Sequence, residues 1–255
     1  MRIENPLGGY AFLKGISPYS AGVVALPGFE IEHVRLTAAH PLKSGFDLID
    51  RHLRLRSRPR QVLCAIELRS PRPFTFGGFQ TFNESYVALL RSWDILLDDM
   101  NPVARTNVAP ELDRPREPVL YGFSMTLRTS NARPSFVVAG AGELPEGSLD
   151  PHEVIRRGET SADALREKIH FVMDLMTSRL AALSVNWAQA TMTQIYTVHD
   201  IHPFLGAEIL GGMREAGRAG IHWYFARPPI EGIEYEMDVR GSWRETILDD
   251  ATVTG

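Results

Sequence analysis

The feature that most constrains the fold is an order of secondary-structure elements that occurs twice along the 255 residues. In each half, apolar spacing and turn residues predict the order strand, helix, strand, helix, strand, strand. After an opening strand, the first half is predicted to contain a helix over 46–53, a strand over 61–68, a helix over 81–97, and strands over 104–108 and 119–127. The second half is predicted to contain a strand over 134–140, a long helix over 161–183, a strand over 191–198, a short helix over 204–213, and strands over 222–226 and 233–239. A repeat of such long period predicts tandem domains rather than a solenoid.

The fold class predicted from this pattern is α+β, with two lobes in tandem that each contain a mixed sheet packed by two helices. The lobes are expected over 1–130 and 131–247, with a short tail over 248–255. Hydrophobic residues make up 44% of the chain, enough for two small domains to bury their cores. In the long helix of the second half, a buried stripe is expected from Leu165, Ile169, Val172, Met173, Met176 and Leu180.

Charge and composition limit the partners and the compartment. A formal net charge of −4 gives no overall basic field, so neither nucleic acid nor an anionic membrane is expected as a partner. No leader-like or membrane-spanning apolar run is evident, which predicts a cytoplasmic protein. Cys64 is the single cysteine and lies in an apolar run, so we expect a buried structural thiol.

Two short motifs in the first half resemble a known family. The segment SPYSAGV (17–23) and the later segment ARTNV (104–108) are similar to the Pro-Tyr-Ser-x-Gly-Val turn and the Ala-Arg-Ser/Thr-x-Val strand of the RidA/YjgF enamine/imine deaminases. Chains of that family are about half as long as this one. The resemblance therefore implies two RidA-like, chorismate-mutase-like lobes in one chain.

The second half carries the complementary motifs. The segment VAGAGELP (138–145) resembles the family's strand ending in Ser-Gly-Gln-x-Pro, and ARPPIEGIEYEMD (226–238) resembles its closing hairpin with a glutamate. Each half lacks what the other keeps: the first has no such glutamate, and Gly220 stands where the second would have its arginine. The resemblance implies one composite pocket, within a chain or between chains. Because sites of that family lie where subunits of a trimer meet, a homotrimer is expected.

The resemblance also implies the substrate-binding residues. Arg105 is expected to bind a substrate carboxylate, because a guanidinium presents two parallel donors to the two carboxylate oxygens. Asn107 on the same strand and Ala141 in the glycine-rich turn are expected to belong to the same binding set. Gly142 is expected to let its backbone N–H approach the ligand, since it has no side chain.

Two catalytic residues are expected on the same basis. Tyr19 would line the pocket and supply a hydroxyl, and Glu236 would orient or deprotonate the attacking water. From the residues alone, other roles stay open: Tyr19 as a turn residue, Glu236 on a solvated strand face, and Arg105 in an ordinary ion pair.

The function predicted is cofactor-independent hydrolytic deamination of an enamine or imine carboxylic acid of the 2-aminomuconate or 2-aminoacrylate type. The first type connects the chain with aromatic degradation. No metal is expected, because His199 and His202 lack a metal-binding pattern and are interpreted as residues of a turn. Two alternatives remain: a chorismatase-like hydrolase or lyase, since chorismatases also fuse RidA-like lobes, and a non-catalytic protein that binds small acids.

Overall fold

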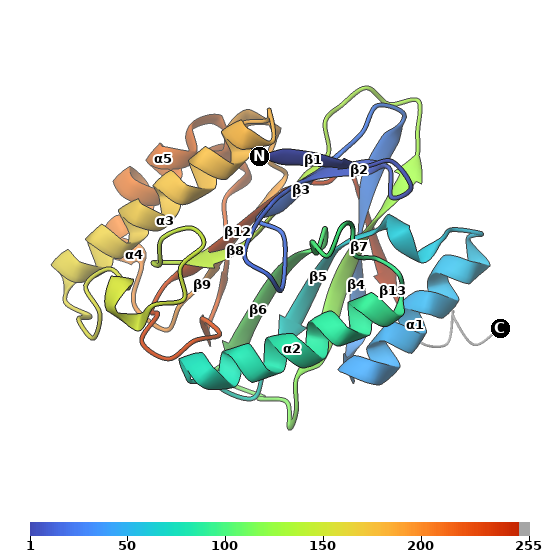
Figure 1. The fold of residues 1–255 in the computed structure, drawn as a ribbon. Helices are drawn as coiled ribbons and strands as arrows, with labels where there is room; N and C mark the ends of the chain where they lie inside the picture. Colours follow the sequence, from blue (N-terminus) through green and yellow to red (C-terminus); the bar gives the residue numbers. More distant parts are fainter. Residues whose placement is uncertain (250–255) are drawn as a thin grey trace.

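The computed structural model describes residues 1–249, and the predicted order of elements is confirmed in both halves (Figure 1). The first half contains β1 (Arg2–Asn5), β2 (Tyr10–Leu13), β3 (Gly22–Ala25), β4 (Phe29–Pro41), α1 (Leu42–Leu55), β5 (Leu63–Arg69), α2 (Phe76–Ser92), β6 (Ala104–Pro110) and β7 (Val119–Arg128). The second half contains β8 (Phe136–Gly142), α3 (Ala162–Ala182), β9 (Met192–Tyr196), α4 (His202–Phe204), α5 (Gly211–Met213), β10 (His222–Tyr224), β11 (Ala226–Arg227), β12 (Glu236–Gly241) and β13 (Arg244–Leu248). A π-helical segment, Leu205–Leu210, joins α4 to α5.

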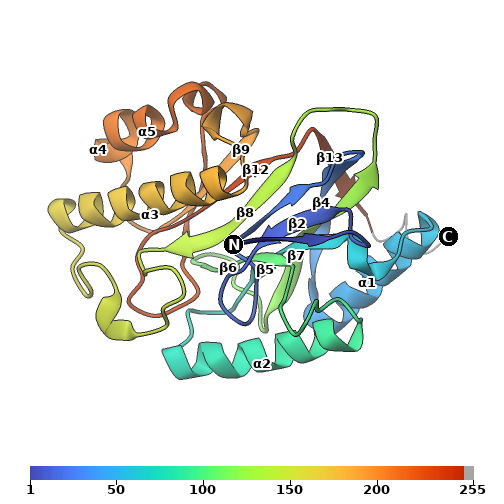
Figure 2. The same cartoon turned by 45° about the horizontal axis from the view of Figure 1, so that its top comes forward.

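Two mixed sheets are stacked face to face between two layers of helices (Figure 2). Helices α1 and α2 pack on one sheet, and α3 with the α4–α5 segment packs on the other. A third apolar cluster, which includes Tyr10, Phe12, Cys64 and Ala104, fills the space between the sheets. The α+β class and the mixed sheets are therefore confirmed. Cys64 is buried as expected, and burial raises the pKa of its thiol.

Each sheet contains strands from both halves of the chain. Within the described residues, one sheet has the order β1-β2-β3-β8-β12-β9-β10 and the other has the order β11-β6-β5-β7-β4-β13. Strand β3 pairs with β8, β11 pairs with β6, and β13 pairs in parallel with β4. The expected arrangement of separate tandem lobes, each with its own sheet, is thus corrected: the sheets do not divide at residue 130.

Some strands of these sheets were missed by the sequence analysis. Strand β2 is buried on both faces, with Ala11 and Leu13 facing the α3 layer and Tyr10 and Phe12 facing the other sheet. A strand buried on both faces has no polar alternation to reveal it. The expected tail begins at Leu248, which instead ends β13, and residues 250–255 lie outside the described part of the chain.

Two element boundaries also differ from expectation. Helix α2 begins five residues earlier than the predicted 81, because the Thr75 hydroxyl accepts a hydrogen bond from the N–H of Gly78 at 3.1 Å and caps the first turn. The helix ends before Asp94, whose φ of 56° is left-handed. The single strand expected over 222–226 is two strands, because β10 and β11 belong to different sheets.

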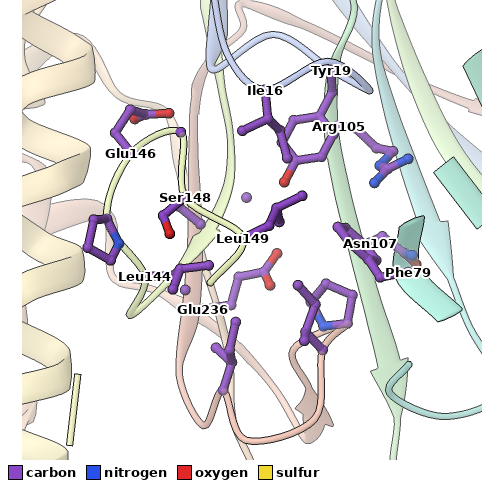
Figure 3. A pocket seen from close by; sticks show the side chains of 18 of the residues that line it. Ile16, Tyr19, Phe79, Arg105, Asn107, Leu144, Glu146, Ser148, Leu149 and Glu236 are labelled. Atoms are coloured by element: carbon purple, nitrogen blue, oxygen red, sulfur yellow. The ribbon is translucent and has the colours of Figure 1, made fainter. Parts of the chain in front are cut away.

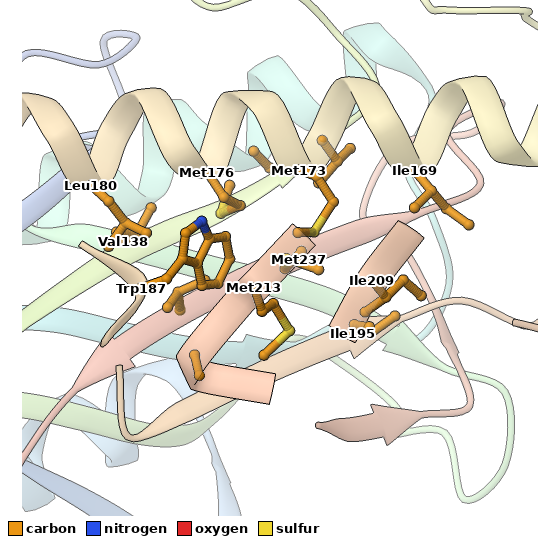
Figure 4. Packing of buried hydrophobic residues seen from close by; sticks show 14 of the residues in the cluster. Val138, Ile169, Met173, Met176, Leu180, Trp187, Ile195, Ile209, Met213 and Met237 are labelled. Atoms are coloured by element: carbon orange, nitrogen blue, oxygen red, sulfur yellow. The ribbon is translucent and has the colours of Figure 1, made fainter. Parts of the chain in front are cut away.

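The core beneath α3 confirms the predicted apolar stripe. All six of its expected residues are buried there, and Met173, Met176 and Leu180 point at the sheet beside Trp187 (Figure 4). The indole N–H of Trp187 donates to the Thr177 hydroxyl at 3.0 Å, which satisfies its polar atom. This packing holds α3 against β8 and β12, the strands that carry part of the site. No helix in residues 1–249 is both long enough and apolar enough to cross a membrane.

Candidate active site

A cavity with a volume of about 70 Å³ lies where β6, β8 and β12 meet the loop that follows β8 (Figure 3). That volume has room for several water molecules or a small polar ligand. The structure brings together at this cavity every residue selected from the sequence: Tyr19, Arg105, Asn107, Ala141, Gly142 and Glu236. Because the first three belong to one half and the others to the other half, the composite pocket forms within a single chain.

Arg105 enters the cavity from β6 and is only 3% exposed. Its guanidinium carbon lies 4.6 Å from the ring centre of Tyr19 and 4.7 Å from that of Tyr86, and its Nη2 donates to Oδ1 of Asn83 at 2.7 Å. Burial lowers the pKa of Arg105, although a guanidinium still keeps its charge. Among the described residues it forms no salt bridge, so a buried cation is held by aromatic rings and one amide.

Two buried donors on residues that line this cavity have no hydrogen-bond partner in the described part of the chain. They are Nη1 of Arg105 and Nδ2 of Asn107, two residues apart on β6 and therefore on the same face. The Oδ1 atom of Asn107 accepts from the Ser70 hydroxyl at 2.9 Å, and the Nδ2 atom is left without a partner. An unsatisfied buried donor costs about 1–3 kcal/mol, and a carboxylate would accept from both.

Glu236 reaches the cavity from β12 and is 4% exposed (Figure 3). Burial raises the pKa of its carboxyl well above the usual value, and the nearby Asp238 raises it further, whereas Arg105 opposes the shift. Behind it, Asp238 is held by the hydroxyls of Thr106 at 2.7 Å and Tyr196 at 3.0 Å. Glu236 therefore holds its proton more readily than an ordinary glutamate and can donate as well as accept one.

The other predicted residues, Tyr19, Gly142 and Ala141, contribute more to packing than the sequence analysis predicted. Tyr19 is half-buried, and its ring packs on Arg105. The pKa of its hydroxyl is raised by burial, with Arg105 opposing. Gly142 is required by packing, because a Cβ there would overlap Cγ2 of Ile233. Ala141 belongs to the apolar cluster under α3, so its side chain contributes to the core.

A buried ion pair that the sequence analysis missed supports the strand carrying Glu236. Nζ of Lys168 lies 3.0 Å from Oε1 of Glu143, and both side chains are fully buried. The Glu143 carboxylate also accepts from the backbone N–H groups of Glu234 and Tyr235, at 2.7 and 3.0 Å. It thereby fixes the residues immediately before Glu236. One signal was available, because Lys168 lies on the apolar stripe of its helix, three residues after Leu165 and four before Val172.

The cavity residues that were not selected from the sequence include three with aromatic or charged side chains. Phe79 of α2 covers the Arg105 guanidinium, while Glu146 and Arg179 form an ion pair on the α3 side. For Arg179 the signal was again a charged residue beside the apolar stripe, adjacent to Leu180. Phe79 and Glu146 carried no comparable signal, because an aromatic residue in a helix and an acid in a turn are common.

The histidines do not form a metal site in the described residues. No group of three or more His, Cys, Asp or Glu side chains is close enough there to hold a metal ion. His199 instead contacts Glu234 at 2.8 Å, and His202 contacts Asp200 at 2.6 Å.

Comparison with known proteins identifies the family of a chain with this cavity. The model of the family described as 2-aminomuconate deaminase CnbZ matches residues 2–246. The chain belongs to this family. A 2-amino-5-chloromuconate deaminase from Comamonas testosteroni is 46% identical to this CnbZ-family chain over 244 residues, which are 94% of this chain and 96% of that protein. Membership of the RidA/YjgF family stays a prediction.

Two solved structures that match this CnbZ-family protein are much less similar to it than that relative is. A chorismatase has a TM-score of 0.46 and 10% identity, covering 94% of this chain and 78% of its own. A cyanuric acid hydrolase from A. caulinodans has a TM-score of 0.39 and 13% identity, covering 86% and 68%. These likenesses are too low to support an argument about chemistry, so the chorismatase alternative gains nothing from them.

Proposed function

We propose that this protein hydrolyses 2-aminomuconate, or a close derivative of it, to the corresponding 2-oxo acid and ammonia without a cofactor. The observation that carries the proposal is the pair of unpartnered buried donors on Arg105 and Asn107 beside the buried carboxyl of Glu236. The family and the relative from Comamonas testosteroni support the substrate class. The homotrimer stays a prediction. All residues that line the cavity belong to one chain, so the cavity itself does not require a partner subunit.

Binding would place the reacting carbon beside Glu236. In 2-aminomuconate the amino group is on the carbon next to one carboxylate. When Arg105 and Asn107 bind that carboxylate, the amino carbon lies on the Glu236 side of the anchor. The surrounding aromatic rings exclude water from the guanidinium, which strengthens its interaction with the anion. Orientation of this kind supplies much of the rate in a reaction whose imine form is already electrophilic.

The proposed steps use Glu236 alternately as acid and base. The protonated carboxyl donates its proton to a carbon of the enamine, which forms the iminium ion and leaves Glu236 ionised. The carboxylate then accepts a proton from water as the water oxygen bonds to the amino carbon. Glu236 next donates that proton to the amino nitrogen. The carbon–nitrogen bond breaks, the hydroxyl proton returns to Glu236, and the 2-oxo acid and ammonia leave.

The variant Arg105→Gln tests the carboxylate anchor. We expect kcat/KM for 2-aminomuconate to fall by about 10²-fold or more, because a charged hydrogen-bond pair contributes about 1.5–3 kcal/mol and its geometry is also lost. The measurement is steady-state loss of substrate absorbance. A suitable control is Arg91→Gln, since Arg91 is an exposed arginine that pairs with Asp99 on the surface. Wild-type kcat/KM in Arg105→Gln would show that the anchor lies elsewhere.

The variant Gly140→Ala tests the placement of the Glu236 carboxyl. A Cβ at this position would overlap Oε1 of Glu236 and lie 3.0 Å from Cγ2 of Thr106, so the carboxyl must move. Displacement of a catalytic group by about 1 Å can cost about 10²-fold in rate, and we expect kcat to fall at least 10-fold with Tm near that of the wild type. Gly77→Ala is the matched control, because its added Cβ has no neighbour within 4 Å among the described residues. Equal kcat values for both variants would argue against the proposed role of Glu236.

A further inference from the structure

A second buried arginine faces this cavity from α3. Arg179 is 7% exposed and lines the same cavity as Arg105. Its Nε donates to Oε2 of Glu146 at 2.8 Å and its Nη2 donates to Oε1 at 3.0 Å. This is the two-bond geometry in which arginine binds a free carboxylate. Its Nη1 donates to the carbonyl of Ala139 at 3.0 Å, which fixes the guanidinium against β8.

The acidic partner of Arg179 comes from a surface turn. The Glu146 side chain is 42% exposed, compared with 8% for that of Arg179. The turn is closed by a backbone bond from Ser148 to Pro145 at 3.0 Å, and Gly147 has a left-handed φ of 83°. Glu146 can therefore leave for water without breaking a strand pairing. Arg179 cannot leave in the same way, because it is buried and held by β8.

The two arginines come from different sides of the cavity. Arg179 pairs with Glu146, and Figure 3 shows Glu146 and Arg105 on opposite sides of the cavity, with Glu236 below both in this view. Both arginines lower the pKa of Glu236, and Arg105 lowers it more than Arg179 does. A linear acid with a carboxylate at each end matches this arrangement. Its reacting carbon would be near Arg105 and Glu236, and its far end near Arg179.

We propose that Arg179 binds the second, far carboxylate of a dicarboxylic substrate, and that Glu146 occupies this position until the substrate displaces it. The inference rests on the proposed function, because it assumes a muconate-like substrate. It makes the α3 side of the cavity the part that selects dicarboxylates over monocarboxylic enamines. Binding then exchanges one carboxylate for another at Arg179, so no buried charge is left unpaired.

Calorimetric titration with two unreactive acids tests this directly. The probes are trans,trans-muconate and sorbate, which share a six-carbon diene chain but carry two carboxylates and one. We expect the wild type to bind muconate at least 10-fold more tightly than sorbate. In Arg179→Gln, the affinity for muconate should fall to that for sorbate, while sorbate affinity stays unchanged. Arg166→Gln is the matched control, because Arg166 is on the same helix and pairs with Glu208 at 3.1 Å outside the cavity.

The variant Glu146→Gln provides an independent arm. A neutral amide competes less strongly for Arg179, so muconate affinity should rise several-fold with sorbate affinity unchanged. The proposal would be overturned if Arg179→Gln lost affinity equally for both acids. It would also be overturned if Glu146→Gln bound muconate no more tightly than the wild type does. If Arg179→Gln does not fold, the exposed position of Glu146 lets the second arm decide alone.

The outcome is separable from that of the proposed function. Neither probe carries an amino group, so binding is measured without turnover. A wild type that prefers muconate but does not deaminate 2-aminomuconate would retain the second anchor and refute the deaminase. A wild type that deaminates the substrate but does not prefer muconate over sorbate would support the deaminase and refute the second anchor.

Discussion

Replacing Glu236 by Gln is expected to lower kcat by about 10²-fold or more while the protein stays folded, because proton transfer by a positioned carboxyl contributes about 10²–10⁴-fold to rate. The amide is nearly the same size, and at 4% exposure the side chain already occupies a closed space. Since burial raises the pKa of Glu236, the neutral amide also resembles the protonated carboxyl that we propose for the free enzyme. Binding of muconate should therefore change little.

The measurements are kcat with 2-aminomuconate and Tm for the same preparation. Glu234→Gln is the control, because Glu234 is two residues away and contacts His199. In the wild type, kcat/KM should fall as the pH rises through the raised pKa of Glu236, since the first step requires the protonated form. Glu236→Gln should lose this limb of the profile. A stable variant with wild-type kcat would remove Glu236 from the mechanism.

The composition of the site could be predicted because its signals are local. Arg105 and Asn107 share one face of a short strand, and Glu236 follows a glycine- and proline-rich turn. Each motif is weak alone, but the two halves lack different parts, and this complementarity predicted a shared pocket. The structure places all of these residues at one cavity, while their chemical roles stay predictions.

What the sequence could not supply depends on contacts between distant segments. The pairing of β3 with β8 and of β13 with β4 joins residues far apart in the chain, and a fully buried strand such as β2 has no alternation that marks its faces. A local motif also cannot show why a residue is present. Gly142 was interpreted as an opening for ligand, whereas Ile233 occupies the space beside it.

Replacing Lys168 by Met is expected to cost about 3–5 kcal/mol in the free energy of unfolding, because it leaves the buried charge of Glu143 without its partner. The two side chains are fully buried and 3.0 Å apart. Burial already raises the pKa of Glu143 and Lys168 opposes that shift, so without Lys168 the carboxyl should take up a proton more readily. Urea unfolding at neutral pH measures the loss. Lys43→Met, which removes an exposed pair with Asp47, should change the free energy by about 1 kcal/mol or less.

A second substitution separates lost charge pairing from lost packing. In Lys168→Met/Glu143→Gln neither side chain of the pair carries a charge, and the amide oxygen can still accept from one of the two N–H groups, those of Glu234 and Tyr235, which bond to different carboxylate oxygens in the wild type. The double variant should therefore be more stable than Lys168→Met alone. If the two unfold at the same urea concentration, the cost comes from packing around the lysine stem. If Lys168→Met itself unfolds like the wild type, the ion pair does not stabilise the strand that carries Glu236, and that strand must be held by its sheet neighbours β8 and β9.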